Sequence, residues 1–107
     1  MKYEELVKKI QCFNKEREWE QFHTPDNLAK SISIEANELL ECFQWSNSDY
    51  NLAEVSEEMA DVFTYLIDMA SALDVDLIEI TNKKVDKNAI KYPVEKAKGN
   101  STKYNKY

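Results

Sequence analysis

Two pairs of acidic residues with the same spacing are the strongest candidates for chemistry in this chain. They are Glu35-x-x-Glu38 and Glu58-x-x-Asp61. Residue 48 lies midway between Glu38 and Glu58, and also midway between Glu35 and Asp61. If the segments on either side of this centre are antiparallel helices, the four carboxylates come level and repel one another unless a cation lies between them. Oxygen-only ligands suit Mg²⁺, with Mn²⁺ as a substitute. A metal-assisted reaction on a phosphorylated substrate is therefore the leading hypothesis.

The angular position of these acids distinguishes them from the other acids of the chain. Projected at about 100° per residue, Glu35 and Glu38 lie on a shoulder beside the apolar stripe of their helix. Glu58 and Asp61 are offset from their own stripe in the same sense, whereas Asp68 falls on that helix's polar face. Because facing antiparallel helices are related by a twofold axis, equal offsets bring both pairs to one side. The alternative, half-buried acids neutralised by lysine or backbone, is weakened because no basic residue shares the shoulder of the first pair.

The remainder of the chain predicts an all-α fold that can hold these acids. One glycine and two prolines leave few positions that break a helix. Thr24 is expected to cap the second helix, ahead of Pro25, and Asp76 to cap the fourth. The middle two of four main helices form a central antiparallel hairpin. Apolar periodicity places the four helices at about residues 3–18, 25–45, 50–73 and 76–92. We expect a helical domain over residues 1–93 and a polar, basic tail over residues 94–107.

Length and charge restrict the partners of this chain. At 107 residues it forms one domain with a limited core, so oligomerisation is expected. Residues 1–82 carry a net charge of −12 and residues 83–107 a net charge of +6. An acidic body disfavours duplex nucleic acid. No apolar run approaches the roughly 20 residues of a membrane span. Cys12 and Cys42 lack metal or redox spacing, which favours reduced thiols and a cytoplasmic location.

Other metal and phosphate chemistries fit the sequence poorly. A helical di-iron site would need Glu-x-x-His motifs, and the single histidine, His23, lies in neither acidic pair. One glycine cannot build a glycine-rich phosphate loop. Phosphate must therefore be bound through a metal and lysine.

Several segments in addition to the acidic pairs resemble one family. The residues are Glu16–His23, Phe43-Gln44-Trp45, Glu57–Val62 and Lys84-x-x-x-Asn88-x-x-x-Tyr92-Pro93. In this order they resemble the MazG-like superfamily of all-α nucleotide pyrophosphohydrolases, most closely its dCTP pyrophosphatase branch. The resemblance covers about residues 13–104. It implies a MazG-like bundle completed by oligomerisation, typically a homotetramer in this branch.

The resemblance also implies an activity and a set of site residues. The activity is Mg²⁺-dependent hydrolysis of a nucleoside triphosphate, dCTP or a base-modified dCTP, to the monophosphate and pyrophosphate. The catalytic and metal-binding residues would be Glu35, Glu38, Glu58 and Asp61, and either acid of the first pair could be the general base. Substrate contacts are expected from aromatic rings that stack on the base, from a histidine and a tyrosine, and from one face of the fourth helix. These residues are Trp19, His23, Trp45, Tyr65, Lys84, Asn88 and Tyr92.

Each of these interpretations has an alternative. The tryptophans could pack in the core, His23 could be structural, and Lys84 could be a surface lysine beside Lys83 and Lys87. The whole chain could be a non-catalytic helical module that binds metal or nucleotide and regulates a partner. It could also be a structural oligomer whose shoulder acids pair with lysines of another subunit, in which case its stability would not depend on Mg²⁺.

Overall fold

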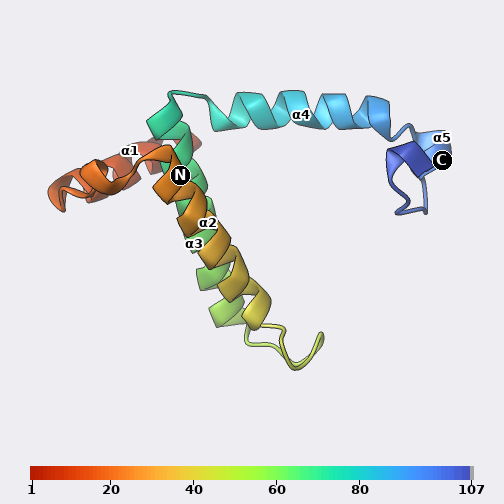
Figure 1. Ribbon diagram of the computed structural model, residues 1–107, viewed down its shortest axis with the longest axis horizontal. Helices are drawn as coiled ribbons and strands as arrows, with labels where there is room; N and C mark the ends of the chain where they lie inside the picture. The colour runs from red at the N-terminus through yellow and green to blue at the C-terminus, as the bar shows by residue number, and fades with distance from the viewer. Residues whose placement is uncertain (107) are drawn as a thin grey trace. The chain divides into compact units, whose positions relative to one another are not determined.

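The computed structural model describes residues 1–106, and every regular element in them is helical (Figure 1). This confirms the all-α prediction. The main helices of the described residues are α1 (Tyr3–Glu16), α2 (Pro25–Glu41), α3 (Leu52–Leu73) and α4 (Leu77–Lys91). Shorter helical turns are η1 (Trp19–Phe22), α5 (Val94–Ala97) and η2 (Tyr104–Lys106). The predicted tail ends on Tyr107, which lies outside the described residues. None of the helices within residues 1–106 has the length and apolar content that crossing a bilayer requires.

The start of α2 is fixed by side chains. The Thr24 hydroxyl accepts a hydrogen bond from the backbone N–H of Asn27 at 3.4 Å, with Pro25 in the first turn, which confirms the predicted cap. The Asn27 side chain in turn donates to the carbonyl of Phe22 at 3.1 Å. These bonds hold η1 against the start of α2, so the aromatic segment between α1 and α2 has a defined position.

Helices α2 and α3 lie side by side as the predicted antiparallel hairpin (Figure 1). The connection is longer than the sequence suggested, because α2 ends at Glu41 rather than near Trp45. The backbone N–H groups of Cys42, Phe43 and Gln44 each bond to the carbonyl three residues back. This is the hydrogen-bond pattern of a 3₁₀-helix, which is wound more tightly than an α-helix. The Ser46 hydroxyl then accepts the N–H groups two and three residues ahead, at 3.1 and 3.0 Å, and stabilises a turn instead of a helix.

The third helix also begins slightly later than predicted, at Leu52 rather than about residue 50. The reason is its cap. The Asn51 side chain accepts hydrogen bonds from the N–H groups of Ala53 and Glu54 at 2.9 and 3.2 Å, which fixes the helix start at the following residue. At the other end, Asp74 adopts a left-handed conformation with φ 53° and ends α3.

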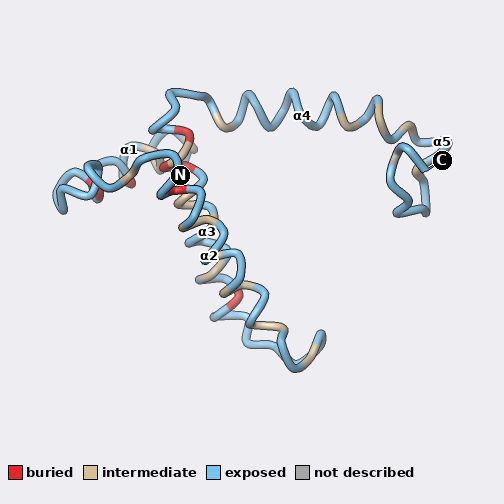
Figure 2. The backbone as a smooth tube through the Cα atoms, viewed as in Figure 1, coloured by how far each residue is buried: buried red, intermediate tan, exposed pale blue. Residues whose placement is uncertain are grey.

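The first compact unit, Met1–Asp74, contains all the residues that the structure shows as buried (Figure 2). Helix α1 joins the hairpin through a buried polar contact, in which the Asn14 side-chain amide donates to Asp68 Oδ1 at 2.8 Å. The apolar core of the described residues is small. Its members are Ile10, Leu28, Val55, Ile67 and Ala70.

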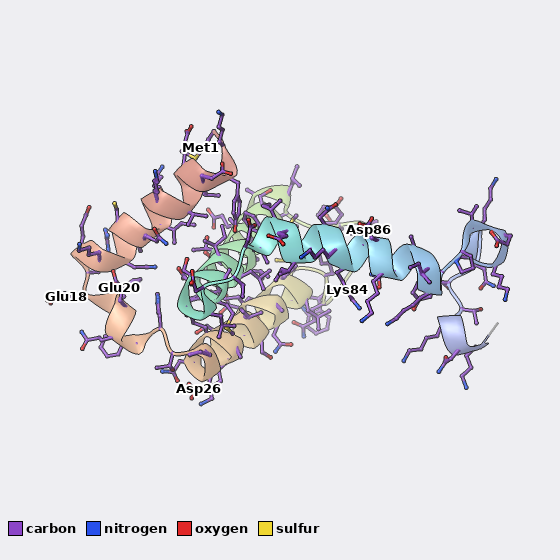
Figure 3. The ribbon with its side chains drawn as sticks, turned by 90° about the horizontal axis from the view of Figure 1, so that it is seen from above. Met1, Glu18, Glu20, Asp26, Lys84 and Asp86 are labelled. Carbon is purple, nitrogen blue, oxygen red and sulfur yellow. The ribbon has the colours of Figure 1, made fainter. Side chains whose placement is uncertain are left out.

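The second unit begins at Val75 and is built on α4. Asp76 caps this helix by accepting the N–H of Glu79 at 3.0 Å, as predicted. Figure 3 labels Lys84 and Asp86, which project to different sides of α4. The helix ends before Pro93, also as predicted.

Candidate metal centre

Three of the four predicted acids meet between α2 and α3. Carboxylate oxygens of Glu35, Glu38 and Glu58 all lie within 4.8 Å of one another. Glu35 and Glu38 are one turn apart on α2, and Glu58 reaches them from α3. The equal offsets of the two pairs from their apolar stripes thus bring side chains of both helices to the same side of the hairpin.

Asp61 lies just outside this group of three. It is one turn beyond Glu58 on α3, and its negative charge acts on both Glu35 and Glu58. Its side chain also lines a neighbouring cavity. The structure therefore places the fourth acid between the acid cluster and that cavity.

Two oxygens of the cluster lack a partner. Glu35 Oε2 and Glu58 Oε2 are buried and accept no hydrogen bond. The ion pairs seen in residues 1–106 join Lys30 to Asp26 and Lys83 to Glu79, and neither includes a cluster acid. Leaving a buried acceptor unpaired is costly, and more so when it is charged. Within the described residues no ion pair thus neutralises the cluster, and its hard oxygen donors fit a cation such as Mg²⁺.

The raised pKa values of two of these acids show that the cluster disfavours negative charge. The pKa of Glu35 is raised to about 7, first by burial and then by a hydrogen bond and the charge of Glu38, with smaller contributions from Asp61 and Glu58. The pKa of Glu58 is also raised, again chiefly by burial and then by Glu38. Because a carboxylate must lose its proton to bind a metal, protons and a divalent ion compete for this site.

A cavity of about 410 Å³ begins beside the acid cluster and collects several predicted substrate contacts. Trp19, His23 and Tyr65 line it together with Asp61. Trp19 contacts the ring of Phe13 edge-on at a centroid distance of 5.5 Å, and 43% of its surface remains exposed. The volume is within the usual range for small-molecule pockets. The aromatic walls can accommodate a planar ring, while Asp61 connects the cavity to the acids.

A larger cavity of about 560 Å³ lies on the α1 side of the same unit. It shares His23 and Asp68 with the first cavity, but none of the four predicted acids lines it. We therefore place the candidate site in the smaller cavity, which adjoins the acids, although the other is roomier.

The other predicted contacts are separate from this cavity. Trp45 lies in the connection after α2 with 90% of its surface exposed. Lys84 and Asn88 share one face of α4, as predicted, and line a shallow cavity of about 490 Å³ there. Tyr92 follows the last residue of α4. Lys84, Asn88 and Tyr92 belong to the second unit, so their part in the site stays a prediction.

Asp68, which was predicted to lie on the polar face of its helix, is buried. Only 6% of Asp68 and 7% of Asn14 is exposed, because α1 packs over this part of α3 and the two side chains bond each other. One signal was available in the sequence. Asn14 falls four residues after Ile10 and next to Phe13, within the apolar stripe of α1, and a polar residue in such a stripe needs a polar partner across the interface.

Comparison with known proteins now identifies the family. A sequence model described as the MazG-like family matches residues 30–106, which include all four acids. The chain belongs to the MazG-like family. This confirms the resemblance inferred from the motifs.

Named relatives of this MazG-like chain share a large part of its sequence. Over 101 residues it is 38% identical to dCTP pyrophosphatase 1 of Mus musculus and 39% identical to that of Homo sapiens. Each match covers 86% of this chain but 59% of the relative, so the chain spans well under two thirds of those proteins. The crystal structure of a pyrophosphatase from Archaeoglobus fulgidus DSM 4304 matches with a TM-score of 0.79 at 43% identity. That match covers 84% of this chain and 91% of the archaeal one.

Proposed function

We propose that this MazG-like chain is a Mg²⁺-dependent nucleoside triphosphate pyrophosphohydrolase. Its substrate is a deoxynucleotide, dCTP or a base-modified dCTP, and its products are the monophosphate and pyrophosphate. The observation that carries the proposal is the cluster of Glu35, Glu38 and Glu58 with two unpartnered buried oxygens, next to a cavity that an aromatic ring can enter. The names of the mouse, human and archaeal relatives support it.

The cluster acids and Asp61 would hold the ion. Bound Mg²⁺ neutralises phosphate charge and polarises the phosphorus that water attacks. Because Glu58 lies on the helix opposite Glu35 and Glu38, the ligands would come from both helices of the hairpin. This placement would suit phosphoryl transfer, in which enzymes work mainly by positioning and charge stabilisation.

The reaction adds one water across the anhydride that joins the α and β phosphates. A bond forms between the water oxygen and phosphorus, the bond from phosphorus to the bridging oxygen breaks, and pyrophosphate leaves. One proton of the water must be accepted nearby. We assign this role to a carboxylate of the α2 pair, Glu35 or Glu38, because both belong to the cluster that would hold the ion against the phosphates.

The cavity beside Asp61 would take the nucleoside. Trp19 offers an exposed ring face for stacking, which is worth roughly 1–3 kcal/mol per base. Tyr65 follows Asp61 by one turn and would contact sugar or phosphate, and His23 would contact the base. Predicted contacts beyond the cavity are retained on the strength of the family motifs. They are stacking by Trp45, triphosphate binding by Lys84, and sugar or base contacts by Asn88 and Tyr92.

The uncovered apolar surface of the hairpin supports a homo-oligomer, which we propose is a tetramer. Leu40 is 68% exposed, Leu52 is 69% exposed and Met59 is 57% exposed, although all three belong to the apolar stripes that the sequence predicts to be buried. Large apolar side chains left in water favour association. Light scattering after size-exclusion chromatography gives the mass directly, and a monomer at every protein concentration would contradict this part of the proposal.

Pyrophosphate release from a panel of canonical and modified nucleoside triphosphates tests the activity. We expect turnover with Mg²⁺, none with EDTA, and deoxycytidine nucleotides at the top of the ranking. Adjacent residues provide a matched pair of variants, because Glu58 belongs to the cluster and Glu57 is exposed. Glu58→Gln should lose turnover and Glu57→Gln should keep it.

Other outcomes distinguish the alternatives. Nucleotide binding without turnover in a folded protein would favour the regulatory module. A melting temperature that is indifferent to Mg²⁺, together with absent turnover, would favour the structural oligomer.

A further inference from the structure

The buried pair Asn14–Asp68 has no role in the chemistry described so far. Aspartate is rarely buried to this extent unless it is paired. Asp68 receives one hydrogen bond, from the Asn14 amide to Oδ1 at 2.8 Å, and the charge of His23 acts on it from nearby. A carboxylate can accept about four hydrogen bonds. The pair thus leaves acceptor capacity at a site that is largely closed to solvent.

The position of the Asp68 carboxylate along α3 indicates which part of a bound nucleotide it would meet. Asp61, Tyr65 and Asp68 follow one another at spacings of four and three, so they share a face of the helix, and all three line the cavity of about 410 Å³. At 1.5 Å per residue, Asp61 and Asp68 are separated by about 10 Å along the axis. This separation is comparable with the length of a nucleoside from its 5′ oxygen to the far edge of its base. A nucleotide whose phosphates lie at the acids and whose base lies along this face of α3 would bring its base edge to Asp68.

We propose that Asp68, oriented by Asn14, accepts a hydrogen bond from the exocyclic amino group of the substrate's base and so selects amino-bearing bases over oxo-bearing ones. This inference rests on the proposed function, because it takes the substrate to be a nucleotide. Carboxylates accept readily from the N4 amino group of cytosine. Uracil and thymine present a carbonyl oxygen at the same position, so two acceptors would face each other in a buried site. Unpaired buried polar groups are the strongest source of substrate rejection.

The pair also joins α1 to α3, and a purely structural role must be separated from selection. A structural contact changes stability and affects all substrates alike. A contact with the base edge changes the ratio between substrates that differ only at that edge. The pair dCTP and dUTP meets this condition, since they differ at position 4 of the pyrimidine.

The decisive measurement is kcat/KM for dCTP and dUTP in the wild type and in Asp68→Asn. The asparagine amide is nearly isosteric. Its oxygen can still accept from Asn14, while its N–H can donate to the carbonyl of uracil. We expect the dCTP-to-dUTP ratio to fall about tenfold or more, in line with the discrimination of a good base contact. An unchanged ratio overturns the inference, whether or not both rates decline.

Two further variants make the result specific. Asn14→Ala removes the donor that orients Asp68, so the ratio should fall, but less than in Asp68→Asn. Ser71→Ala is the matched control, because Ser71 accepts a hydrogen bond from Gln11 at 3.4 Å and so also links α3 to α1, yet it does not line the acid-side cavity. Its ratio should equal that of the wild type. If Asp68→Asn fails to fold by circular dichroism, an unchanged ratio in Asn14→Ala overturns the inference.

Failure of the proposed function would be visible separately. If the wild type hydrolyses no nucleotide, the affinities for dCMP and dUMP are measured by calorimetry in the wild type and in Asp68→Asn. A smaller preference for dCMP in the variant sustains base selection without catalysis. Equal preference in both proteins overturns it.

Discussion

Replacing Glu35 by glutamine is expected to stabilise the metal-free protein in weakly alkaline solution and to remove much of its stabilisation by Mg²⁺. The ionised side chain is half-buried among other acids, with one oxygen unpartnered. Glutamine has nearly the same shape without the charge. The variant therefore relieves repulsion when no metal is present and weakens the site when metal is present.

The sign and size of the effect follow from the pKa of Glu35. The folded state raises it from 4.5 to about 7, so the stability linked to this group is fully present below pH 4.5 and is lost as the pH rises through 7. At about 1.4 kcal/mol per pH unit the upper limit is about 3.4 kcal/mol. Solvent screening of a half-buried group reduces this to about 1–2 kcal/mol. For a chain of this length the corresponding change in Tm is roughly 5–10 °C.

Thermal unfolding followed by circular dichroism measures this directly, at about pH 5 and pH 8, in EDTA and in excess Mg²⁺. At equal protein concentration in EDTA, Glu35→Gln should melt above the wild type at the higher pH and close to it at the lower pH. Glu57→Gln, an exposed acid on α3, should follow the wild type in every condition. If the wild type and Glu35→Gln respond identically to pH in EDTA, the acids do not repel one another as described, and the argument for a cation fails.

Three further outcomes are expected. Glu38→Gln and Asp61→Asn should keep the far-ultraviolet spectrum of the wild type and lose pyrophosphate release; unaltered turnover in either would remove that acid from the site. Trp45→Ala should leave Tm nearly unchanged, because 90% of the residue is exposed, and weaken nucleotide binding about five- to a hundredfold; unchanged affinity in a calorimetric titration would contradict its stacking role. Asn14→Ala should lower the free energy of unfolding in urea by about 1–3 kcal/mol, since it leaves buried Asp68 without its hydrogen bond; a change within error would mean that solvent reaches the carboxylate.

The helical hairpin and its acids could be predicted from the sequence because both depend on periodicity. A stripe that repeats every three to four residues fixes which side of a helix faces its partner, and the equal spacing of the two acidic pairs fixes their level. The caps at Thr24 and Asp76 were predictable for a similar reason, since their side chains bond backbone groups only three residues away. These are local or symmetric relations, which a single sequence contains in full.

What the sequence could not supply is the packing of α1 and the detail of the turn. Asn14 and Asp68 are 54 residues apart. The place of Asn14 in an apolar stripe indicates that it has a polar partner, but nothing local identifies that partner as Asp68. The early end of α2 is associated with a turn in which the Ser46 hydroxyl accepts two backbone N–H groups, and such local bonds compete with the helix. The position of Asp61 outside the group of three likewise depends on the offset between two helices, which helical projection does not define.

The unpartnered oxygens favour a functional reading of the acids over a structural one. Acids retained for stability would be expected to have the partners that acids elsewhere in this chain possess. Asp26 pairs with a lysine one turn away on α2, and Glu79 pairs with one on α4. Glu35 and Glu58 instead have half-buried carboxylates whose pKa values are raised chiefly by burial and then by Glu38, and one oxygen of each has no hydrogen-bond partner. Such strain persists when a ligand compensates for it, and the ligand that suits oxygen donors on two facing helices is a divalent cation.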